Sequence, residues 1–417
     1  MHKDVIDELI NPANTKITPG LDKIKLALKY LGNPQNNYKV IHITGTNGKG
    51  STATFIETGL VHAKYDVGKY TSPHQHRINE TIVHNGIQIT DADLESIFFK
   101  IKQVLVEHAI ELSPFELLTT LMFYYFSDKQ IEYLVLEVGM GGEHDATNVI
   151  TQPLISIITN ISLEHTNWLG NSLVEIAHEK AGIIKNNTVI IADNTPELIT
   201  EILNRTAIYT NILDKYEITN SLDFTDFKTT VEFKEYSSGI LRKYTLNLFG
   251  KFQALNFLCA YQVFRQLNLA EEHIKFSAEH TIWPGRLQLI ATNPNTLLDA
   301  THNEAGAKVL YETLSVNYNR EDVVIITSIL ADKNIPQMLA HFNKISSYII
   351  LTSISNTSRG LPASNLYEIA KKNSYQSIET NYYHEEEPIK AFELAKSMNK
   401  KLIVITGSLY LLHYYKF

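Results

Sequence analysis

Residues 44–51, which read TGTNGKGS, have the composition of a phosphate-binding loop. Glycines permit a tight turn whose backbone N–H groups, together with the N-terminus of the next helix, favour phosphate oxygens. Lys49 adds a full positive charge. The spacing differs from the common G-x-x-x-x-G-K-[ST] pattern, because Gly50 separates Lys49 from Ser51 and Ile43 takes the place of the first glycine. We therefore predict a variant phosphate site; the alternative is a glycine-rich turn without a ligand.

Two residues at the ends of apolar runs are candidate metal ligands. Glu137 lies near the end of the run 133–138, and a carboxylate at the tip of a buried strand is costly unless it meets a cation. Beside a phosphate loop the natural cation is Mg²⁺; the alternative is a helix cap or an ion pair. His165 follows the run 154–159, where α/β sheets build their sites, and its alternative is a surface or packing role.

The elements that must position these residues alternate between short β-rich runs and amphipathic stretches, as in α/β folds. The turn at 237–239 predicts an antiparallel hairpin between its flanking runs. The expected strands are 39–44, 133–138, 154–159, 189–192, 229–234 and 241–248, and the expected helices are 51–62, 91–110, 114–127, 175–184 and 252–267.

The segment 283–286, which reads WPGR, is the best domain boundary, because Pro and Gly together interrupt helix and strand. A second alternating series follows it, about the size of one doubly wound domain. Its expected strands are 296–299, 322–329, 348–353 and 401–406. We predict two α/β domains, 1–283 and 284–417.

Composition excludes several classes of protein. The chain has 417 residues, of which 44% are hydrophobic and 20% charged, so it is neither a disordered chain nor a coiled coil. Its 37 basic and 45 acidic residues give a net charge of −8, which argues against a nucleic-acid binder. One cysteine, Cys259, permits no intrachain disulfide. Acidic residues within 1–9 and the lack of a long apolar run predict a cytoplasmic protein without a membrane span.

Taken together, the motifs resemble the folylpolyglutamate synthase/dihydrofolate synthase family, within the Mur-ligase superfamily of ATP-dependent amide-forming ligases. The resemblance runs almost end to end. It rests on 44–51 (TGTNGKGS), 70–74 (YTSPH), 77–80 (RINE), 136–148 (LEVGMGGEHDATN), 159–170 (TNISLEHTNWLG), 179–185 (EKAGIIK), 283–288 (WPGRLQ) and 299–303 (DATHN).

This resemblance implies a fold and an activity. The fold would be an N-terminal P-loop ATPase domain of the Mur-ligase type and a smaller, Rossmann-like C-terminal glutamate-ligase domain. The activity would be ATP-dependent addition of L-glutamate to dihydropteroate, tetrahydrofolate or both through an acyl phosphate. ATP and Mg²⁺ would be the cofactors, with two Mg²⁺ ions expected and K⁺ as a further candidate. A monomer that binds neither nucleic acid nor membrane is expected.

The resemblance also implies roles for the metal-site residues. The Mg²⁺ ligands would be Ser72, Glu137 and His165. Lys180, which its helical pattern alone assigns to solvent, would carry a carbamate that supports a second Mg²⁺. Carbamylation requires a lysine of lowered pKa, because only the neutral amine captures CO₂.

ATP contacts carry over in the same way. The phosphates would be held by Gly48, Lys49, Gly50 and Ser51, and the further ATP contacts would be Asn256, Arg286 and Asp299. Lys49, Lys180 and Arg286 would be the catalytic residues. The alternatives are a polar helix residue at Asn256, a hinge ion pair at Arg286 and a helix cap at Asp299.

For the substrates, Phe115 would stack on a pterin ring and Glu116 would accept hydrogen bonds, or Phe115 would be core. Asp145 is a further substrate or structural candidate, and His302 and Ser408 are weaker candidates for binding glutamate.

The sequence departs from the family at Glu143, where many members have arginine. This reversal leaves open whether both synthase activities are present. Two other functions remain as alternatives: a Mur-type ligase for a cell-wall precursor, and an ATP-binding regulator that ligates nothing.

Overall fold

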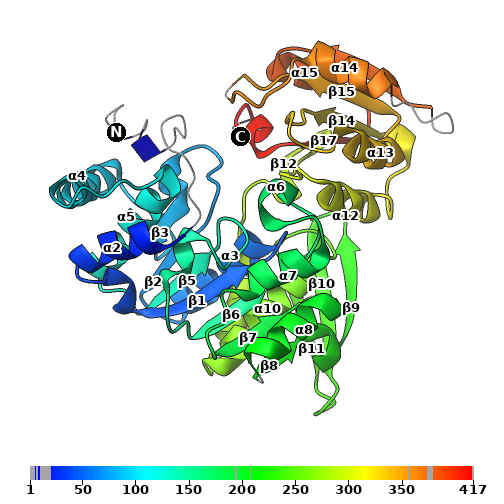
Figure 1. Ribbon diagram of the computed structural model, residues 1–417. Coiled ribbons are helices and arrows are strands. Elements are labelled where there is room, and N and C mark those ends of the chain that lie inside the picture. The colour runs from blue at the N-terminus through cyan, green and yellow to red at the C-terminus, as the bar shows by residue number, and fades with distance from the viewer. Residues whose placement is uncertain are drawn as a thin grey trace. The chain divides into compact units, whose positions relative to one another are not determined.

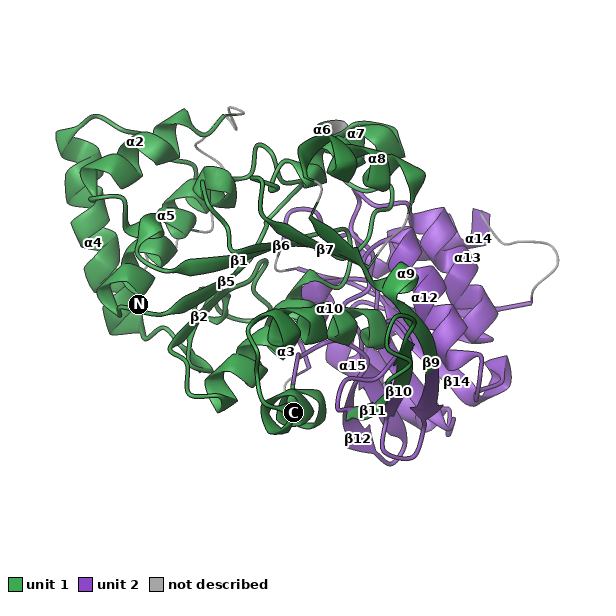
Figure 2. Ribbon diagram, turned by 90° about the horizontal axis from the view of Figure 1, so that it is seen from below, with its two compact units in different colours: residues 1–219, 231–245, 253–281 green, residues 220–230, 246–252, 282–417 purple. Residues whose placement is uncertain are grey.

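Two compact units make up the chain in the computed structural model, which describes residues 5, 8, 9, 20–192, 195–206, 208–355, 357–372 and 379–415. Unit 1 comprises residues 1–219, 231–245 and 253–281, and unit 2 comprises 220–230, 246–252 and 282–417 (Figure 2).

An eight-stranded sheet forms the centre of unit 1, in the order β4-β3-β2-β5-β1-β6-β7-β8. In this order, neighbours run parallel from β2 through β5, β1, β6 and β7 to β8. At the other edge, β3 pairs antiparallel with β2, and β4 pairs antiparallel with β3. The strands are β1 (Lys39–Thr44), β2 (Val67–Tyr70), β3 (Ile82–His84), β4 (Ile87–Gln88), β5 (Tyr133–Glu137), β6 (Ile155–Ile158), β7 (Thr188–Ile191) and β8 (Tyr209–Asn211). Continuous apolar runs suit the central strands, because helices cover both faces (Figure 2).

Helices α3 and α10 lie together on one face of this sheet, and α2, α4, α5, α7 and α8 cover the other (Figure 2). Phe55 of α3 meets Phe257 of α10 edge to face, with 5.4 Å between ring centroids. Cys259 of α10 is fully buried. Among the residues of unit 1 that the structure describes, the α-helices are α2 (Asp22–Tyr30), α3 (Lys49–His62), α4 (Asp91–Glu107), α5 (Pro114–Asp128), α6 (Thr166–Leu169), α7 (Leu173–Ala181), α8 (Pro196–Arg205), α9 (Ile212–Lys215), α10 (Gln253–Gln266) and α11 (Glu271–His280).

A three-stranded sheet, in the order β11-β10-β9, follows α9. Its strands are β9 (Tyr216–Asp223), β10 (Lys228–Glu235) and β11 (Leu241–Leu246). The two strands of the predicted hairpin are neighbours here. The sequence did not predict β9, because most of its side chains are polar and exposed.

Unit 2 is built on a six-stranded sheet in the order β12-β13-β17-β14-β15-β16 (Figure 1). All neighbours run parallel except β12, which is antiparallel at the edge. The elements are β12 (Gln288–Thr292), β13 (Asn295–Leu298), β14 (Val323–Thr327), β15 (Tyr348–Thr352), β16 (Asn381–Glu385), β17 (Leu402–Thr406), α12 (Glu304–Leu314), α13 (Ile335–Ile345), α14 (Ala363–Lys372), α15 (Pro388–Ser397) and α16 (Leu409–Leu412). The predicted fold class, a parallel-sheet α/β unit followed by a second α/β unit, is confirmed.

None of the helices in the described ranges combines the length and the apolar character that a membrane crossing requires.

Candidate active site

The phosphate-binding loop joins the end of β1 to the start of α3, as the sequence predicts. Two of its glycines are required by their surroundings. A Cβ on Gly45 would lie 1.9 Å from Thr159 Oγ1, and a Cβ on Gly48 would lie 2.3 Å from Asn256 Oδ1. Gly48 also adopts a φ of 88°, in the left-handed region. Asn256 of α10 therefore lies directly against the loop, and its contact with ATP stays a prediction.

Gly48→Ala is expected to lower ADP affinity by at least about tenfold, or about 1.4 kcal/mol. The methyl group would push Asn256 and the loop apart. Gly32→Ala is the matched control, because Gly32 has a φ of 83° and a Cβ added there would meet nothing within 4 Å. Both changes cost about 1–2 kcal/mol of stability for the left-handed backbone. Calorimetric titration with ADP should therefore separate them; equal affinities in the two variants would contradict the close approach.

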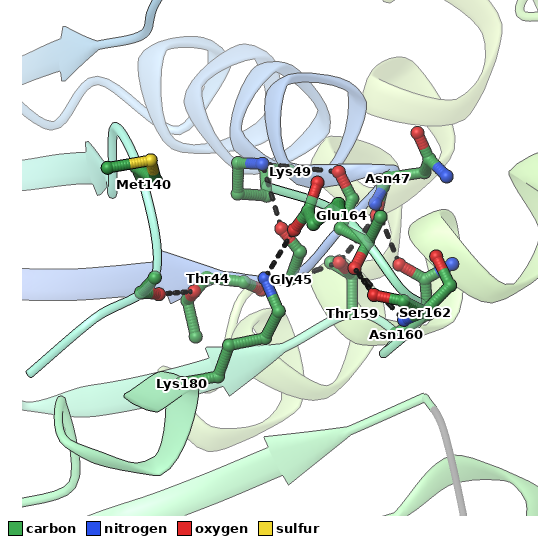
Figure 3. Close-up of polar contacts among 12 residues, drawn as sticks. Thr44, Gly45, Asn47, Lys49, Met140, Thr159, Asn160, Ser162, Glu164 and Lys180 are labelled. Atoms are coloured by element: carbon green, nitrogen blue, oxygen red, sulfur yellow. Dashed lines mark hydrogen bonds and ion pairs between the residues drawn. The ribbon is translucent and has the colours of Figure 1, made fainter. Parts of the chain in front are cut away.

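The segment 159–162, which follows β6, holds the phosphate-binding loop through hydrogen bonds (Figure 3). The N–H of Thr46 donates to the Asn160 carbonyl at 2.9 Å, and the N–H of Asn47 donates to Asn160 Oδ1 at 2.8 Å. Thr159 Oγ1 donates to the Asn47 carbonyl at 2.6 Å, and the N–H of Ser162 donates to Thr46 Oγ1 at 3.0 Å. Because β1 and β6 are parallel neighbours, their carboxyl ends meet here and fix the loop before any ligand binds.

Lys49 opens α3 and folds back over the loop. Its ammonium donates to the carbonyls of Gly45, at 2.8 Å, and Thr46, at 3.3 Å. Ser51 is buried in the first turn of the same helix. The loop thus combines a helix N-terminus, a glycine-rich backbone and one ammonium, which is the chemistry that a polyphosphate requires.

Lys180 is buried, although its local sequence pattern predicts a solvated lysine. It lies on α7, and its side chain is only 1% exposed, so the alternative of a solvated lysine is wrong. Its ammonium donates to Glu164 Oε1 at 2.7 Å (Figure 3). Burial lowers the pKa of Lys180 to about 8, with a further contribution from the charge of Lys49, although Glu164 acts in the opposite sense. At neutral pH the neutral fraction of this amine is therefore larger than that of an exposed lysine, which suits a group that reacts with CO₂.

Glu164 was missed by the sequence analysis. Burial would raise its pKa, but Lys180 and Lys49 outweigh burial and lower it. The carboxylate is therefore ionised between two lysines beside the phosphate loop. Its only sequence signal was its place directly before His165.

The three predicted metal ligands lie at the end of β5 and on the loops that follow β2 and β6. Glu137 is the last residue of β5 and is buried, whereas Ser72 is half-buried and His165 is exposed. His165 has a φ of 46°, an unfavourable conformation that its surroundings must hold. Within the described residues, no three His, Cys, Asp or Glu side chains form a cluster that could hold a metal. The predicted set, Ser72, Glu137 and His165, contains two such residues and a hydroxyl. This suits an ion that keeps water and phosphate oxygens among its ligands. The metal site therefore stays a prediction.

The candidates for the pterin side differ in their surroundings. Phe115 is half-buried and packs on Gly139, where a Cβ would lie 2.4 Å from its Cζ. Glu116 Oε2 accepts from the N–H of Ser113 at 2.8 Å and from its hydroxyl at 2.7 Å, in a capping box that begins α5. Asp145 is buried and accepts from the N–H of Met140 and of Thr147. Asp145 and Glu116 thus each shape a loop whether or not they bind substrate.

Glu143, the departure from the family pattern, is paired within the chain. Its Oε2 lies 3.3 Å from the guanidinium of Arg205 and 3.4 Å from Nε2 of His178. The negative charge is thus balanced by a cation from α8.

Four predicted residues of unit 2 lie at or near the carboxyl ends of its strands. Asp299, directly after β13, is buried and accepts from the N–H groups of Leu287 and Thr301. The helix cap proposed as its alternative role is instead Asn303. Arg286 lies in the turn that Asp299 holds through Leu287.

His302 and Ser408 occupy neighbouring loops of the same edge. His302 Nδ1 lies 3.0 Å from the Ala300 carbonyl, and Ser408 caps α16 by accepting from the N–H of Tyr410. The loops meet where the N–H of Gly407 donates to the Thr301 carbonyl.

Sequence reasoning missed a row of buried hydroxyls at this edge. They belong to Thr327, Ser328, Thr352 and Thr406, and none has a hydrogen-bond partner among the described residues. Unsatisfied buried hydroxyls at the carboxyl ends of parallel strands are suited to binding a polar ligand. Their signal was a threonine ending each apolar strand.

Comparison with known proteins agrees with this geometry. The family model of the Mur ligase middle domain matches residues 43–264, and that of the dihydrofolate synthetase C-terminal domain matches 286–414. The dihydrofolate synthase/folylpolyglutamate synthase of Bacillus subtilis is 32% identical, over 94% of this chain and 93% of its own. The folylpolyglutamate synthase of Lacticaseibacillus casei is 31% identical, over 93% and 92%. E. coli FolC, solved with DHPP and ADP, superposes with a TM-score of 0.87 at 25% identity, covering 99% of this chain and 95% of its own.

The fold and the loop define an ATP-dependent ligase of the Mur type, an enzyme that forms amide bonds. More narrowly, the chain belongs to the dihydrofolate synthase/folylpolyglutamate synthase family.

Proposed function

We propose that the enzyme adds L-glutamate to both dihydropteroate and tetrahydrofolate. The observation that carries the proposal is the phosphate loop, fixed by 159–162, with Lys49 above it and the buried Lys180 beside it. This arrangement supports transfer of a phosphoryl group to a carboxylate by positioning and charge neutralisation.

The reaction would proceed in two displacements. A carboxylate oxygen of the folate attacks the γ-phosphorus of ATP, the bond to the bridging oxygen breaks, and ADP leaves. The neutral amine of glutamate then attacks the acyl phosphate, and the carbon–oxygen bond breaks to release phosphate. Lys49 and Arg286 would neutralise charge on the migrating phosphoryl group.

ATP would be held by Gly48, Lys49, Gly50 and Ser51, with Asn256, Arg286 and Asp299 as further contacts. Ser72, Glu137 and His165 would hold one Mg²⁺, and a carbamate on Lys180 would support a second, with K⁺ as a further candidate. When bound, these ions would supply positive charge to the phosphates. Relatives solved with ADP, of 25% and 26% identity, support the nucleotide part of this proposal.

Each substrate candidate takes a role in this scheme. Phe115, Glu116 and Asp145 would contact the pterin, and His302 and Ser408 would contact glutamate. Residues 1–283 would bind ATP and 284–417 would serve glutamate ligation. We further propose a cytoplasmic monomer, and the unpaired Cys259 supports a reducing compartment.

The proposal includes both acceptors, dihydropteroate and tetrahydrofolate, because the charge of Glu143 is balanced within the chain. With its carboxylate paired to Arg205 and His178, the reversal from arginine adds no unbalanced negative charge beside the site. The curated relatives point both ways: the Saccharomyces cerevisiae relative, 31% identical over 82% of this chain and 83% of its own, is named a dihydrofolate synthetase, whereas the L. casei relative is a folylpolyglutamate synthase.

ADP release with ATP, Mg²⁺ and L-glutamate is therefore expected with dihydropteroate in one tube and with tetrahydrofolate in another. Turnover with tetrahydrofolate alone would refute the first activity and make Glu143→Arg the next variant. A folded enzyme that turns over only nucleotide-linked sugar peptides would favour a cell-wall ligase. Tight ATP binding without turnover on any acceptor would favour a regulator.

A further inference from the structure

A cavity of about 360 Å³ lies in unit 1 at the C-terminal end of α10, away from the phosphate loop. Its walls come from β8, β9, β10, β11, α10 and the short helix α9. The loop contacts α10 at Asn256, and Arg265 on the cavity wall is nine residues further on, about 13 Å along the helix axis. The volume falls in the range of small-molecule pockets, which begins at about 300 Å³.

Positive charge dominates the lining. Lys215, Arg242 and Arg265 face the cavity together with a single carboxylate, that of Glu235. Glu271, outside the lining, lies 3.2 Å from Arg242 and partly balances it. Arg265 is exposed and has no carboxylate within ion-pair distance in the described part of the chain. With Glu235 beside Lys215 and Glu271 beside Arg242, the three cations leave one net positive charge at the cavity, that of Arg265, which an added anion would balance.

Two of the three cations are held by contacts within the chain, Arg242 by Glu271 and Lys215 by the groups named next. Lys215 donates to Gln262 Oε1 at 3.3 Å and lies 3.5 Å from Glu235, while the Gln262 amide donates to the hydroxyl of Tyr216. These groups stand on a floor of buried rings, in which Phe233 meets Tyr216 and Tyr261 edge to face at 5.1 and 5.0 Å between centroids. Such pre-positioned donors lower the entropy cost of binding.

Arg265, near the C-terminal end of α10, also lines the cavity. Burial raises the pKa of both Tyr216 and Tyr261, and the positive charge of Arg265 acts against that rise in each. Because Arg265 lines the cavity, its guanidinium can meet a carboxylate or a phosphate there in a fork geometry.

We propose that this cavity binds a small anion carrying a carboxylate or phosphate group, with Arg265, Lys215 and Arg242 supplying the charge. The site is separate from the phosphate loop and does not depend on the proposed acceptors of the ligase. Free carboxylates and free phosphate share the recognition chemistry, so the test has an arm for each.

The test is calorimetric titration of the full-length enzyme, without ATP, with glutarate in one arm and inorganic phosphate in the other, at constant ionic strength. One equivalent of at least one anion should bind. Arg265→Gln should weaken that binding at least tenfold, and Glu235→Gln should tighten it, since it removes the competing carboxylate. ADP release by Arg265→Gln should be unchanged.

Lys243→Gln is the matched control. Lys243 is next to Arg242 on β11, but it is 65% exposed and paired with Glu232. The Lys243→Gln variant loses the same charge as Arg265→Gln, but at a position outside the cavity. Its anion titration should therefore resemble that of wild type. Lys49→Ala, which alters the phosphate loop, should still bind one equivalent of the anion. Absence of binding in both arms, or equal weakening in Arg265→Gln and Lys243→Gln, would overturn the proposal, as would loss of the equivalent in Lys49→Ala.

Discussion

Replacing Lys49 by alanine is expected to lower ATP-dependent ligation by about 10²–10³-fold, the loss typical when one preorganised charge-stabilising donor is removed. The ammonium already lies over the loop, bonded to the carbonyls of Gly45 and Thr46. It therefore needs little reorganisation to meet a phosphate. The measurement is the rate of ADP release at saturating ATP, with and without an acceptor.

Lys64→Ala is the control for this variant, because Lys64 is an exposed lysine just beyond the other end of α3. It removes the same charge from the same stretch of chain but should leave the rate within about twofold of wild type. Ligation that survives Lys49→Ala unchanged would refute the mechanism proposed above.

Replacing Lys180 by methionine is expected to lower ligation at least about 10²-fold and to cost roughly 3–5 kcal/mol of stability. The stability loss follows because Glu164, 11% exposed, would keep its charge without its partner. The double variant Lys180→Met/Glu164→Gln removes both charges, so it should recover most of the stability and remain inactive. The ligation rate of Glu164→Gln alone should stay within about tenfold of that of wild type.

These variants separate a chemical role from a structural one. If Lys180 served only as a structural ion-pair partner, the stable double variant would be active. The pH dependence adds a second criterion. Only the neutral amine captures CO₂, and burial places the pKa of Lys180 at about 8, so stimulation of the wild-type enzyme by bicarbonate should grow as the pH rises towards this value.

The same shift has a consequence for stability. The folded pKa lies below that of an exposed lysine, so between the two values the unfolded chain holds more protons than the folded one. In CO₂-free buffer, the free energy of unfolding of wild type should therefore rise with pH in this window, relative to the double variant.

The sequence identified the strands that lead into the phosphate loop, Glu137 and the segment 159–170 because they are buried on both faces, but it did not predict the equally buried β2, which precedes Ser72. Strands β1, β5, β6 and β7 are short apolar runs, and such runs predict buried parallel strands. The loop after β1 followed from its glycines and its lysine. By contrast, β9 and β16 carry largely exposed polar side chains, so nothing in their hydrophobic pattern distinguished them from loops.

Within the site, what the sequence could not provide was pairing between distant residues. Lys180 has an ordinary helical neighbourhood, and its burial against Glu164 depends on how α7 packs on the loop after β6. Glu143 reaches Arg205, 62 residues away, only once α7 and α8 lie together. Asp299 proved to hold the turn at Leu287 rather than cap a helix, which depends on the register of β12 and β13.

The burial of Cys259 makes the molecule convenient for labelling. Burial raises the pKa of its thiol to about 12, so the reactive thiolate is scarce at neutral pH and reagents are kept out by α10's packing. Cysteines introduced at exposed positions such as Ile87 in unit 1 and Val316 in unit 2 would then be the only reactive thiols. A dye pair attached there would report the separation of the two units in solution, with and without nucleotide, on an otherwise unaltered background.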